Sequence, residues 1–188
     1  GTTHFRTLRS TRSLGLFHSL DFFHDISILN KPIPAKLLRH PIHFVSLGFG
    51  SGLSPYAPGT MGTLVAIPLY LLIANLPQSI YLGIIVVGFF LGVYFCHLTS
   101  RALDVHDHPG IVWDEVIGFW ITMIAVPVLN WQWIAAGFVL FRFFDIVKPW
   151  PVKLADKHLQ GGFGIMFDDV LAGIYALICM QLLHYILN

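Results

Sequence analysis

The sequence predicts an all-α protein embedded in a membrane, a bundle of about four to five hydrophobic helices that follows a loop rich in glycine and proline. Apolar residues make up 55% of the 188 residues and charged residues only 11%, which is far from the balance of soluble domains. Long apolar runs occupy the last two thirds of the chain. Most charged residues lie in the N-terminal part and in alternate connections between these runs, as in a multi-pass membrane protein.

The apolar runs define the expected helices. We expect helices at about 61–76, 80–98, 116–129, 133–147 and 168–187. The uncharged breaks at 77–79 and 130–132 are short, as between antiparallel neighbours. If all five helices cross, every Lys and Arg outside these helices falls on the opposite side, which the positive-inside rule places in the cytoplasm, and Arg142 lies near the end of its helix on that side. However, 14 to 16 residues rise only about 22 Å against a hydrocarbon core of about 30 Å, so a partly embedded bundle is an alternative.

The N-terminal part differs from the rest. Six of the 11 Lys and Arg residues lie within residues 1–40, which we interpret as a basic arm, disordered or interfacial, ahead of a membrane-embedded domain at 41–188. The first 20 residues contain no acid, as in a bacterial cytoplasmic tail or an organellar targeting segment, and we favour the tail. Cys96 and Cys179 lie in apolar runs and predict packing residues, not a disulfide.

A loop with five glycines and two prolines spans residues 48–63. It lacks the sequence of a P-loop and the strand context of a dinucleotide fingerprint. Thr60 is expected to cap the helix that follows, where free N–H groups favour a phosphate. We therefore name Ser51 and Thr60 as candidate substrate-binding residues. The alternative is a tight re-entrant turn that serves packing alone.

Two acidic pairs, Asp114-Glu115 and Asp168-Asp169, stand where apolar helices are expected to begin. Favourable interaction with the helix dipole would explain acids at these positions. It does not explain Gly118 and Gly173, about one turn further on, which would let two helices approach closely and bring the acids together. Converging carboxylates repel unless a cation joins them, and hard oxygen ligands indicate Mg²⁺. We therefore predict a magnesium site formed by Asp114, Glu115, Asp168 and Asp169.

Arg142, Asp145 and Lys148 follow each other at three-residue spacing and would share one stripe of a helix that ends at Pro149. These are our candidate catalytic residues: Lys148 and Arg142 would bind phosphate oxygens, and Asp145 would be a metal ligand or a base. The alternative is an internal ion pair at the membrane interface.

Two further segments contain residue types of interest. Asp107 and His108 are candidate substrate-binding residues, although a polar interfacial turn explains them better, because their spacing fits no known zinc motif. The glycines at 161–164 would form a hinge or a lid.

Common phosphatase signatures are missing. Cys96 and Arg101 are one residue too close for a Cys-x5-Arg loop, no Asp-x-Asp motif occurs, and Lys148 has no Arg-Pro seven residues on. The motifs for phosphate hydrolysis through a covalent enzyme intermediate are therefore missing, which leaves direct attack by metal-activated water.

Four segments together carry a family resemblance: 48–63, 105–118, 141–151 and 161–173. In this order they resemble bacterial phosphatidylglycerophosphatase A, over about residues 41–185. The resemblance implies a Mg²⁺-dependent phosphoric monoester hydrolase (EC 3.1.3.27) of the inner membrane, and the distribution of Lys and Arg predicts that its active site faces the cytoplasm. Such an enzyme converts phosphatidylglycerophosphate in the bilayer to phosphatidylglycerol and phosphate, and needs no nucleic acid or obligate protein partner.

Two other classes remain as alternatives. An ion or proton transporter would also use carboxylates in the membrane, but these acids lie at expected helix starts, not in mid-span. A CDP-alcohol transferase is also acidic and membrane-bound, but its Asp-Gly-x2-Ala-Arg signature is not found.

Overall fold

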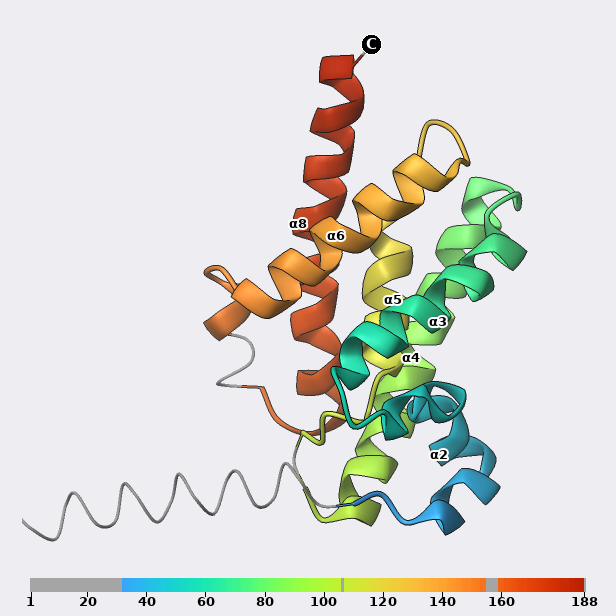
Figure 1. Ribbon diagram of the computed structural model, residues 1–188, viewed down its shortest axis with the longest axis vertical. Coiled ribbons are helices and arrows are strands. Elements are labelled where there is room, and N and C mark those ends of the chain that lie inside the picture. Colours follow the sequence, from blue (N-terminus) through green and yellow to red (C-terminus); the bar gives the residue numbers. More distant parts are fainter. Residues whose placement is uncertain (1–31, 106, 155–158, 188) are drawn as a thin grey trace, which may run out of the picture. The chain divides into compact units, whose positions relative to one another are not determined.

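A computed structural model describes residues 32–105, 107–154 and 159–187 (Figure 1). The predicted basic arm therefore lies mostly outside the described residues. The chain divides into Gly1–Pro32 and Ile33–Asn188, and the second unit is described here by itself. Its described residues are helical and contain no strand, which confirms the all-α prediction. The elements are η1 (Ala35–Arg39), α2 (Pro41–Ser46), η2 (Gly48–Leu53), α3 (Pro58–Ile73), α4 (Gln78–Leu103), α5 (Trp113–Thr122), α6 (Trp131–Val147) and α8 (Gly161–Leu187).

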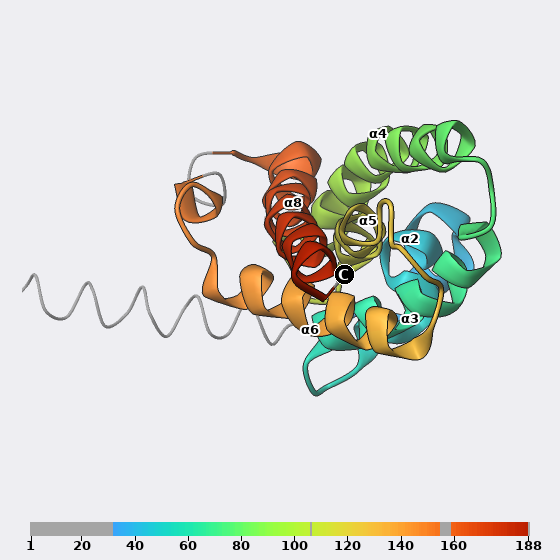
Figure 2. The same ribbon diagram turned by 90° about the horizontal axis from the view of Figure 1, so that it is seen from above.

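The short helix α5 is the centre of the bundle. It packs against α8, α3, α4 and α6, and Figure 2 shows it between them. Every residue from Asp114 to Thr122 is buried. Because α5 is enclosed on all sides, its two acids at the N-terminal end are placed inside the protein and not at its surface.

Gly118 of α5 and Gly173 of α8 let these two helices approach closely, as the sequence predicted. A Cβ on Gly173 would lie 2.5 Å from the carbonyl oxygen of Gly118, and a Cβ on Gly118 would lie 2.8 Å from that of Asp169. Backbone atoms cannot move aside as a flexible side chain can, so a larger residue at either position would force the two helices apart. The contact draws the acidic segments of α5 and α8 together.

Helix α5 differs from the expected helix at 116–129. It begins at Trp113 and ends at Thr122, because Ala125 adopts a left-handed conformation with φ of 55° and Pro127 follows two residues later. The residue before a proline avoids the helical region, so the apolar run 123–129 continues as a connection. An apolar composition alone therefore overestimated the length of this helix.

Helix α8 begins earlier than expected, at Gly161 instead of residue 168. The predicted hinge or lid at 161–164 is wrong, because these glycines form the first turn of the helix. A Cβ on Gly162 would overlap the carbonyl oxygen of Val93 in α4, and one on Gly164 would lie 2.5 Å from that of Leu159. The glycines thus allow close packing of α8 against its neighbours. Because α8 begins at Gly161, Asp168 and Asp169 lie about two turns inside the helix and not at its start.

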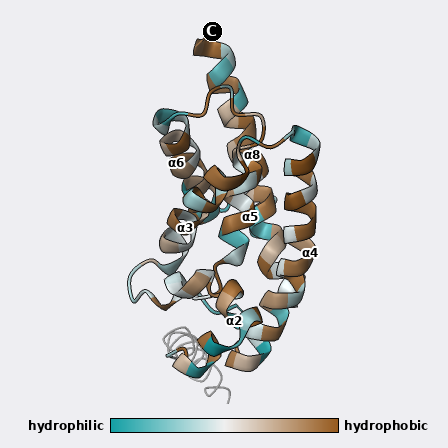
Figure 3. Ribbon diagram, turned by 90° about the vertical axis from the view of Figure 1, so that its right-hand side faces the viewer, coloured by the Kyte–Doolittle hydropathy of each residue, from teal (hydrophilic) through white to brown (hydrophobic). Residues whose placement is uncertain are grey.

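Helices α4 and α8 have the length and composition to cross a membrane. They contain 26 and 27 residues, and only 28% and 22% of their apolar windows are buried inside the protein, so long apolar faces remain outside. Hydrophobic colours cover most of α4 in Figure 3. Exposed apolar surface of this extent marks a membrane or partner contact, and the protein is membrane-associated. Among the described residues no further helix meets the same test, and α3 is a shorter apolar helix of 16 residues.

Candidate active site

Three of the four predicted metal ligands converge inside the bundle. Asp114 and Glu115 belong to the first turn of α5 and Asp169 to α8, and one carboxylate oxygen from each lies within 4.8 Å of the other two. All three side chains are buried, with exposed fractions of 9%, 8% and 3%. The close α5–α8 contact at Gly118 and Gly173 is what brings them together.

This acid cluster, Asp114, Glu115 and Asp169, has properties that fit a divalent cation. Oδ1 of Asp114, Oε2 of Glu115 and Oδ2 of Asp169 are buried and have no hydrogen-bond partner. Ionised carboxylates only accept hydrogen bonds, so buried oxygens without a donor are costly unless a cation binds them. A cation with a preference for hard oxygen ligands, such as Mg²⁺, would supply the missing partner to all three.

Burial and neighbouring charges also affect the protonation of the two α5 acids. Burial raises the pKa of the Asp114 carboxyl well above its usual range, and the neighbouring charge of Glu115 adds to the effect. Burial also raises the pKa of Glu115, followed by the charge of Asp169. The protein alone thus disfavours the charged forms of both groups, and a bound cation would oppose this by favouring ionised carboxylates.

Asp168, the fourth predicted ligand, faces a different partner. Its Oδ2 accepts a hydrogen bond from Lys148 Nζ at 2.7 Å, and it is not one of the three converging acids. Adjacent residues on a helix point about 100° apart, so Asp168 and Asp169 reach different neighbours. The carboxylate of Asp168 therefore pairs with Lys148, the predicted phosphate-binding lysine.

The Arg142, Asp145 and Lys148 stripe is only partly helical. Arg142 Nη1 lies 2.6 Å from Asp145 Oδ2 one turn further on and 3.9 Å from Glu115 Oε1. Helix α6 ends at Val147, and Lys148 follows in a left-handed conformation with φ of 45°. Such a conformation is rare outside glycine. It takes Lys148 out of the predicted stripe and turns it toward Asp168 in α8.

The start of α3 forms another wall of the site. The predicted capping role of Thr60 is wrong, because α3 begins at Pro58 and its N-cap is Ala57, which makes no side-chain hydrogen bond. The backbone of Gly59 lies against Glu115 and Arg142, so Thr60 is next to a residue that contacts the site. Ser51 lies in η2, where its buried hydroxyl has no hydrogen-bond partner.

Asp107 and His108 lie on the connection from α4 to α5. His108 is buried, and its Nδ1 accepts a hydrogen bond from the Gly110 amide at 3.0 Å. Asp107 is exposed but near enough to affect Asp114 through its charge. The geometry therefore gives His108 a structural contact in the turn and leaves its predicted role in substrate binding as a prediction.

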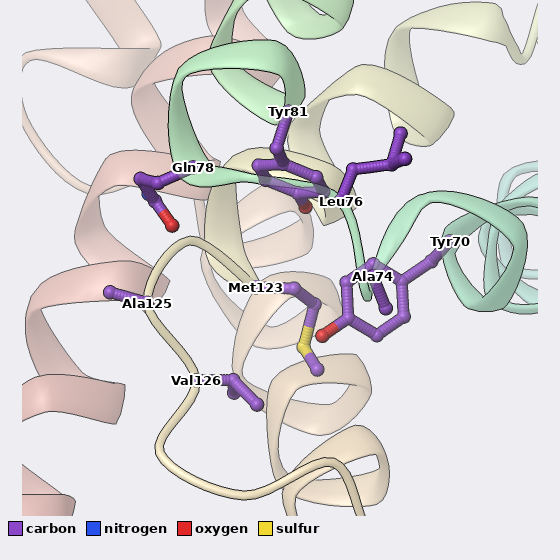
Figure 4. Close-up of a pocket in the computed structure, with 8 residues that line it drawn as sticks. All are labelled: Tyr70, Ala74, Leu76, Gln78, Tyr81, Met123, Ala125 and Val126. Carbon is purple, nitrogen blue, oxygen red and sulfur yellow. The ribbon is translucent and has the colours of Figure 1, made fainter.

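A cavity of about 70 Å³ lies away from the acids. It is formed where the α3–α4 turn meets the connection after α5, and Figure 4 shows Tyr70, Gln78, Tyr81 and Met123 around it. Tyr81 donates a hydrogen bond to the carbonyl oxygen of Trp120 at 2.6 Å. The cavity contains no charged residue and is at the opposite end of α5 from Asp114.

Residues 44–184 match the family model of phosphatidylglycerophosphatase A. The chain belongs to the phosphatidylglycerophosphatase A family. It is 52% identical over 137 residues to phosphatidylglycerophosphatase A of Escherichia coli K12, covering 73% of this chain and 80% of that one. It is 48% identical over 157 residues to the protein of the same name from Haemophilus influenzae, covering 83% and 96%. No solved structure matches the chain. The resemblance inferred from four sequence segments is thereby confirmed.

All residues of the acid cluster, with Arg142, Asp145, Lys148 and Asp168, lie within the phosphatidylglycerophosphatase A match. Sequence reasoning missed two features of this site. It did not foresee that Asp168, which stays a predicted metal ligand, accepts a hydrogen bond from Lys148 beyond the end of α6. It also treated Gly59 as part of a loop. The signal that was available is Pro58, which is favoured in the first turn of a helix.

Proposed function

We propose that this chain hydrolyses phosphatidylglycerophosphate to phosphatidylglycerol and phosphate at the acid cluster, with Mg²⁺ as cofactor. The observation that carries the proposal is the set of three buried carboxylates with unsatisfied oxygens beside two basic side chains. Membership of a family described as phosphatidylglycerophosphatase A supports the substrate. Two relatives that are about half identical carry the same name.

Charge explains why a cation is required for this reaction. When all are ionised, Asp114, Glu115, Asp145, Asp168 and Asp169 bring five negative charges, and Arg142 and Lys148 bring two positive ones. The remaining three negative charges would repel a phosphate monoester. Mg²⁺ held by Asp114, Glu115 and Asp169 would supply positive charge that stabilises phosphoryl oxygens as negative charge develops on them.

The basic residues are placed to bind the phosphate. Arg142 has an exposed side-chain fraction of 15% and Lys148 of 27%, so both can meet a ligand from outside. Each is held by a carboxylate, Asp145 or Asp168, at 2.6 or 2.7 Å. A side chain fixed in this way loses less freedom when it binds phosphate oxygens, which favours binding and orientation.

Asp145 is the candidate base. It is held by Arg142 and is close enough to Asp169 for the two side chains to interact. Its side chain is 14% exposed, so water can reach it. In this proposal Asp145 accepts a proton from the water that attacks the phosphorus. The phosphorus–oxygen ester bond to the lipid then breaks. The lipid alkoxide leaves and takes up a proton from solvent.

The membrane placement is also part of the proposal. We infer that the chain crosses a bacterial inner membrane more than once and that the acid cluster faces the cytoplasm. The asymmetry of Lys and Arg in the sequence supports this orientation. The acyl chains would stay in the bilayer while the headgroup reaches Arg142 and Lys148. The transporter alternative gains no support, because the matched family is a phosphatase family.

The test is phosphate release by the purified protein from three lipids: phosphatidylglycerophosphate, phosphatidic acid and lysophosphatidic acid. We expect release from phosphatidylglycerophosphate to be fastest, and a Lys148→Ala variant to lose most of it, because Lys148 binds the phosphate. Ion flux in proteoliposomes without any phosphate release would contradict the proposal.

A further inference from the structure

Gly59, the second residue of α3, lies against two functional side chains from other helices. A Cβ added to Gly59 would overlap Oε1 of Glu115 in α5. It would also lie 3.0 and 3.2 Å from the Nη1 and Nη2 atoms of Arg142 in α6. Among the glycines of the described residues, this is the one whose added Cβ would meet a carboxylate and a guanidinium.

Both side chains already have partners in the site. Glu115 is 8% exposed and belongs to the acid cluster. Arg142 is held by Asp145 at 2.6 Å and lies 3.9 Å from Glu115. A shift of either would change the distance between a predicted metal ligand and a predicted phosphate-binding group.

The backbone of Gly59 is held as well. The preceding residues are Ala57, in a left-handed conformation, and Pro58, whose ring fixes its own φ. The hydroxyl of Thr63 donates a hydrogen bond to the Gly59 carbonyl oxygen at 3.0 Å. One turn further on, a Cβ on Gly62 would lie 2.6 Å from Cβ of Val112, so α3 packs closely against the residue that precedes α5.

We propose that Gly59 is a positioning residue of the phosphatase site. The absence of a side chain lets the α3 backbone lie against Glu115 and Arg142 and sets the separation of their charged groups. The inference rests on the proposed function and deepens it, because it makes the start of α3 part of the site. It also gives a purpose to the Pro58-Gly59 sequence that packing between helices alone does not require.

The test compares Gly59→Ala with two matched variants. Gly83→Ala is the neutral control, because a Cβ on Gly83 in α4 meets no atom within 4 Å. Gly62→Ala is the steric control, because the three atoms nearest to its Cβ all belong to Val112 and none is a charged group. For each variant we would measure the thermal unfolding temperature, kcat/KM on phosphatidylglycerophosphate and the Mg²⁺ concentration that gives half-maximal activity.

We expect Gly59→Ala to lower kcat/KM by roughly 10- to 100-fold, in line with the cost of a misplaced group in an active site, and to raise the half-maximal Mg²⁺ concentration. Gly83→Ala should behave as the unchanged protein. Gly62→Ala should lower the unfolding temperature without moving the Mg²⁺ dependence of the folded enzyme. If Gly59→Ala changes only the amount of folded protein, as Gly62→Ala does, the inference is overturned.

A second substitution separates a positioning role from a general packing role. Glu115→Asp shortens the side chain that Gly59→Ala would push, so the double variant should lose less activity than the product of the two single losses. If Gly59→Ala alone does not fold, recovery of folded double variant supports the overlap with Glu115, and failure to recover it overturns the inference. If the protein without any substitution has no activity on phosphatidylglycerophosphate, the proposed function itself is refuted.

Discussion

Asp168 and Asp169 are neighbours in sequence, but their carboxylates have different partners. Asp169 faces Asp114 and Glu115, whereas Asp168 accepts a hydrogen bond from Lys148. The turn of about 100° between consecutive helix residues separates the two carboxylates. One dipeptide thus contributes one carboxylate to the acid cluster and the other to Lys148, the proposed phosphate-binding residue.

Because their surroundings differ, substitution of Asp169 and substitution of Asp168 should have different effects on activity. Asp169→Asn should lower phosphate release by roughly 100-fold or more, the upper end of the losses known for residues that merely support metal ligands, and should abolish the response to added Mg²⁺. Asp168→Asn should lower kcat/KM by only about 10-fold, because it loosens Lys148, and should leave the half-maximal Mg²⁺ concentration unchanged. Enzyme kinetics over a range of Mg²⁺ concentrations measures both. Equal effects of the two variants on the Mg²⁺ dependence would show that Asp168 is a ligand too.

The identity of the acids was predictable at this scale, and their partners were not. Residue type, spacing and the following glycines indicated Asp114, Glu115, Asp168 and Asp169 as a group, and three of these four converge. The position of Lys148 depends on a left-handed backbone beyond the end of α6, which no periodic pattern reveals. The Lys148–Asp168 pair therefore required the structure.

At the scale of elements, the contact between α5 and α8 determines where the acids meet. Helix α5 is short and enclosed, and α8 passes it at Gly118 and Gly173. The glycines lie about one turn beyond the acidic pairs. Closer helix axes at the glycines therefore mean closer carboxylates at the acid cluster.

This arrangement predicts the effect of Gly173→Ala. The new Cβ would lie 2.5 Å from the Gly118 carbonyl oxygen, so the helices must separate, and overpacking of this kind costs about 1 to 3 kcal/mol. We expect a lower free energy of unfolding in detergent and a lower activity, because Asp169 moves away from Glu115. Gly83→Ala is again the control. Unchanged stability of Gly173→Ala would mean that the contact between α5 and α8 is looser than described.

Helix existence was predictable and helix ends were less so. The five expected apolar helices correspond to α3, α4, α5, α6 and α8. The early start of α8 was missed because glycines usually weaken helices, and here they are required by close contact with Val93 and Leu159. The early end of α5 was missed because the run after it stays apolar up to Leu129.

At the scale of the whole unit from residue 33 on, two environments are separated. Apolar side chains of α4 and α8 remain exposed along most of their length, as expected for surfaces that contact lipid. The acids of the cluster are buried within the same bundle. A lipid substrate suits this division, because its acyl chains can stay outside while its phosphate reaches the charged interior.

The central claim is that the buried acid cluster holds a cation needed for hydrolysis. The most direct test is phosphate release from phosphatidylglycerophosphate by the purified protein, first in EDTA and then after Mg²⁺ is restored. The acid cluster predicts that activity is lost in EDTA and returns with Mg²⁺, and that Asp169→Asn stays inactive throughout. Full activity in EDTA would contradict the claim, as would full activity of Asp169→Asn.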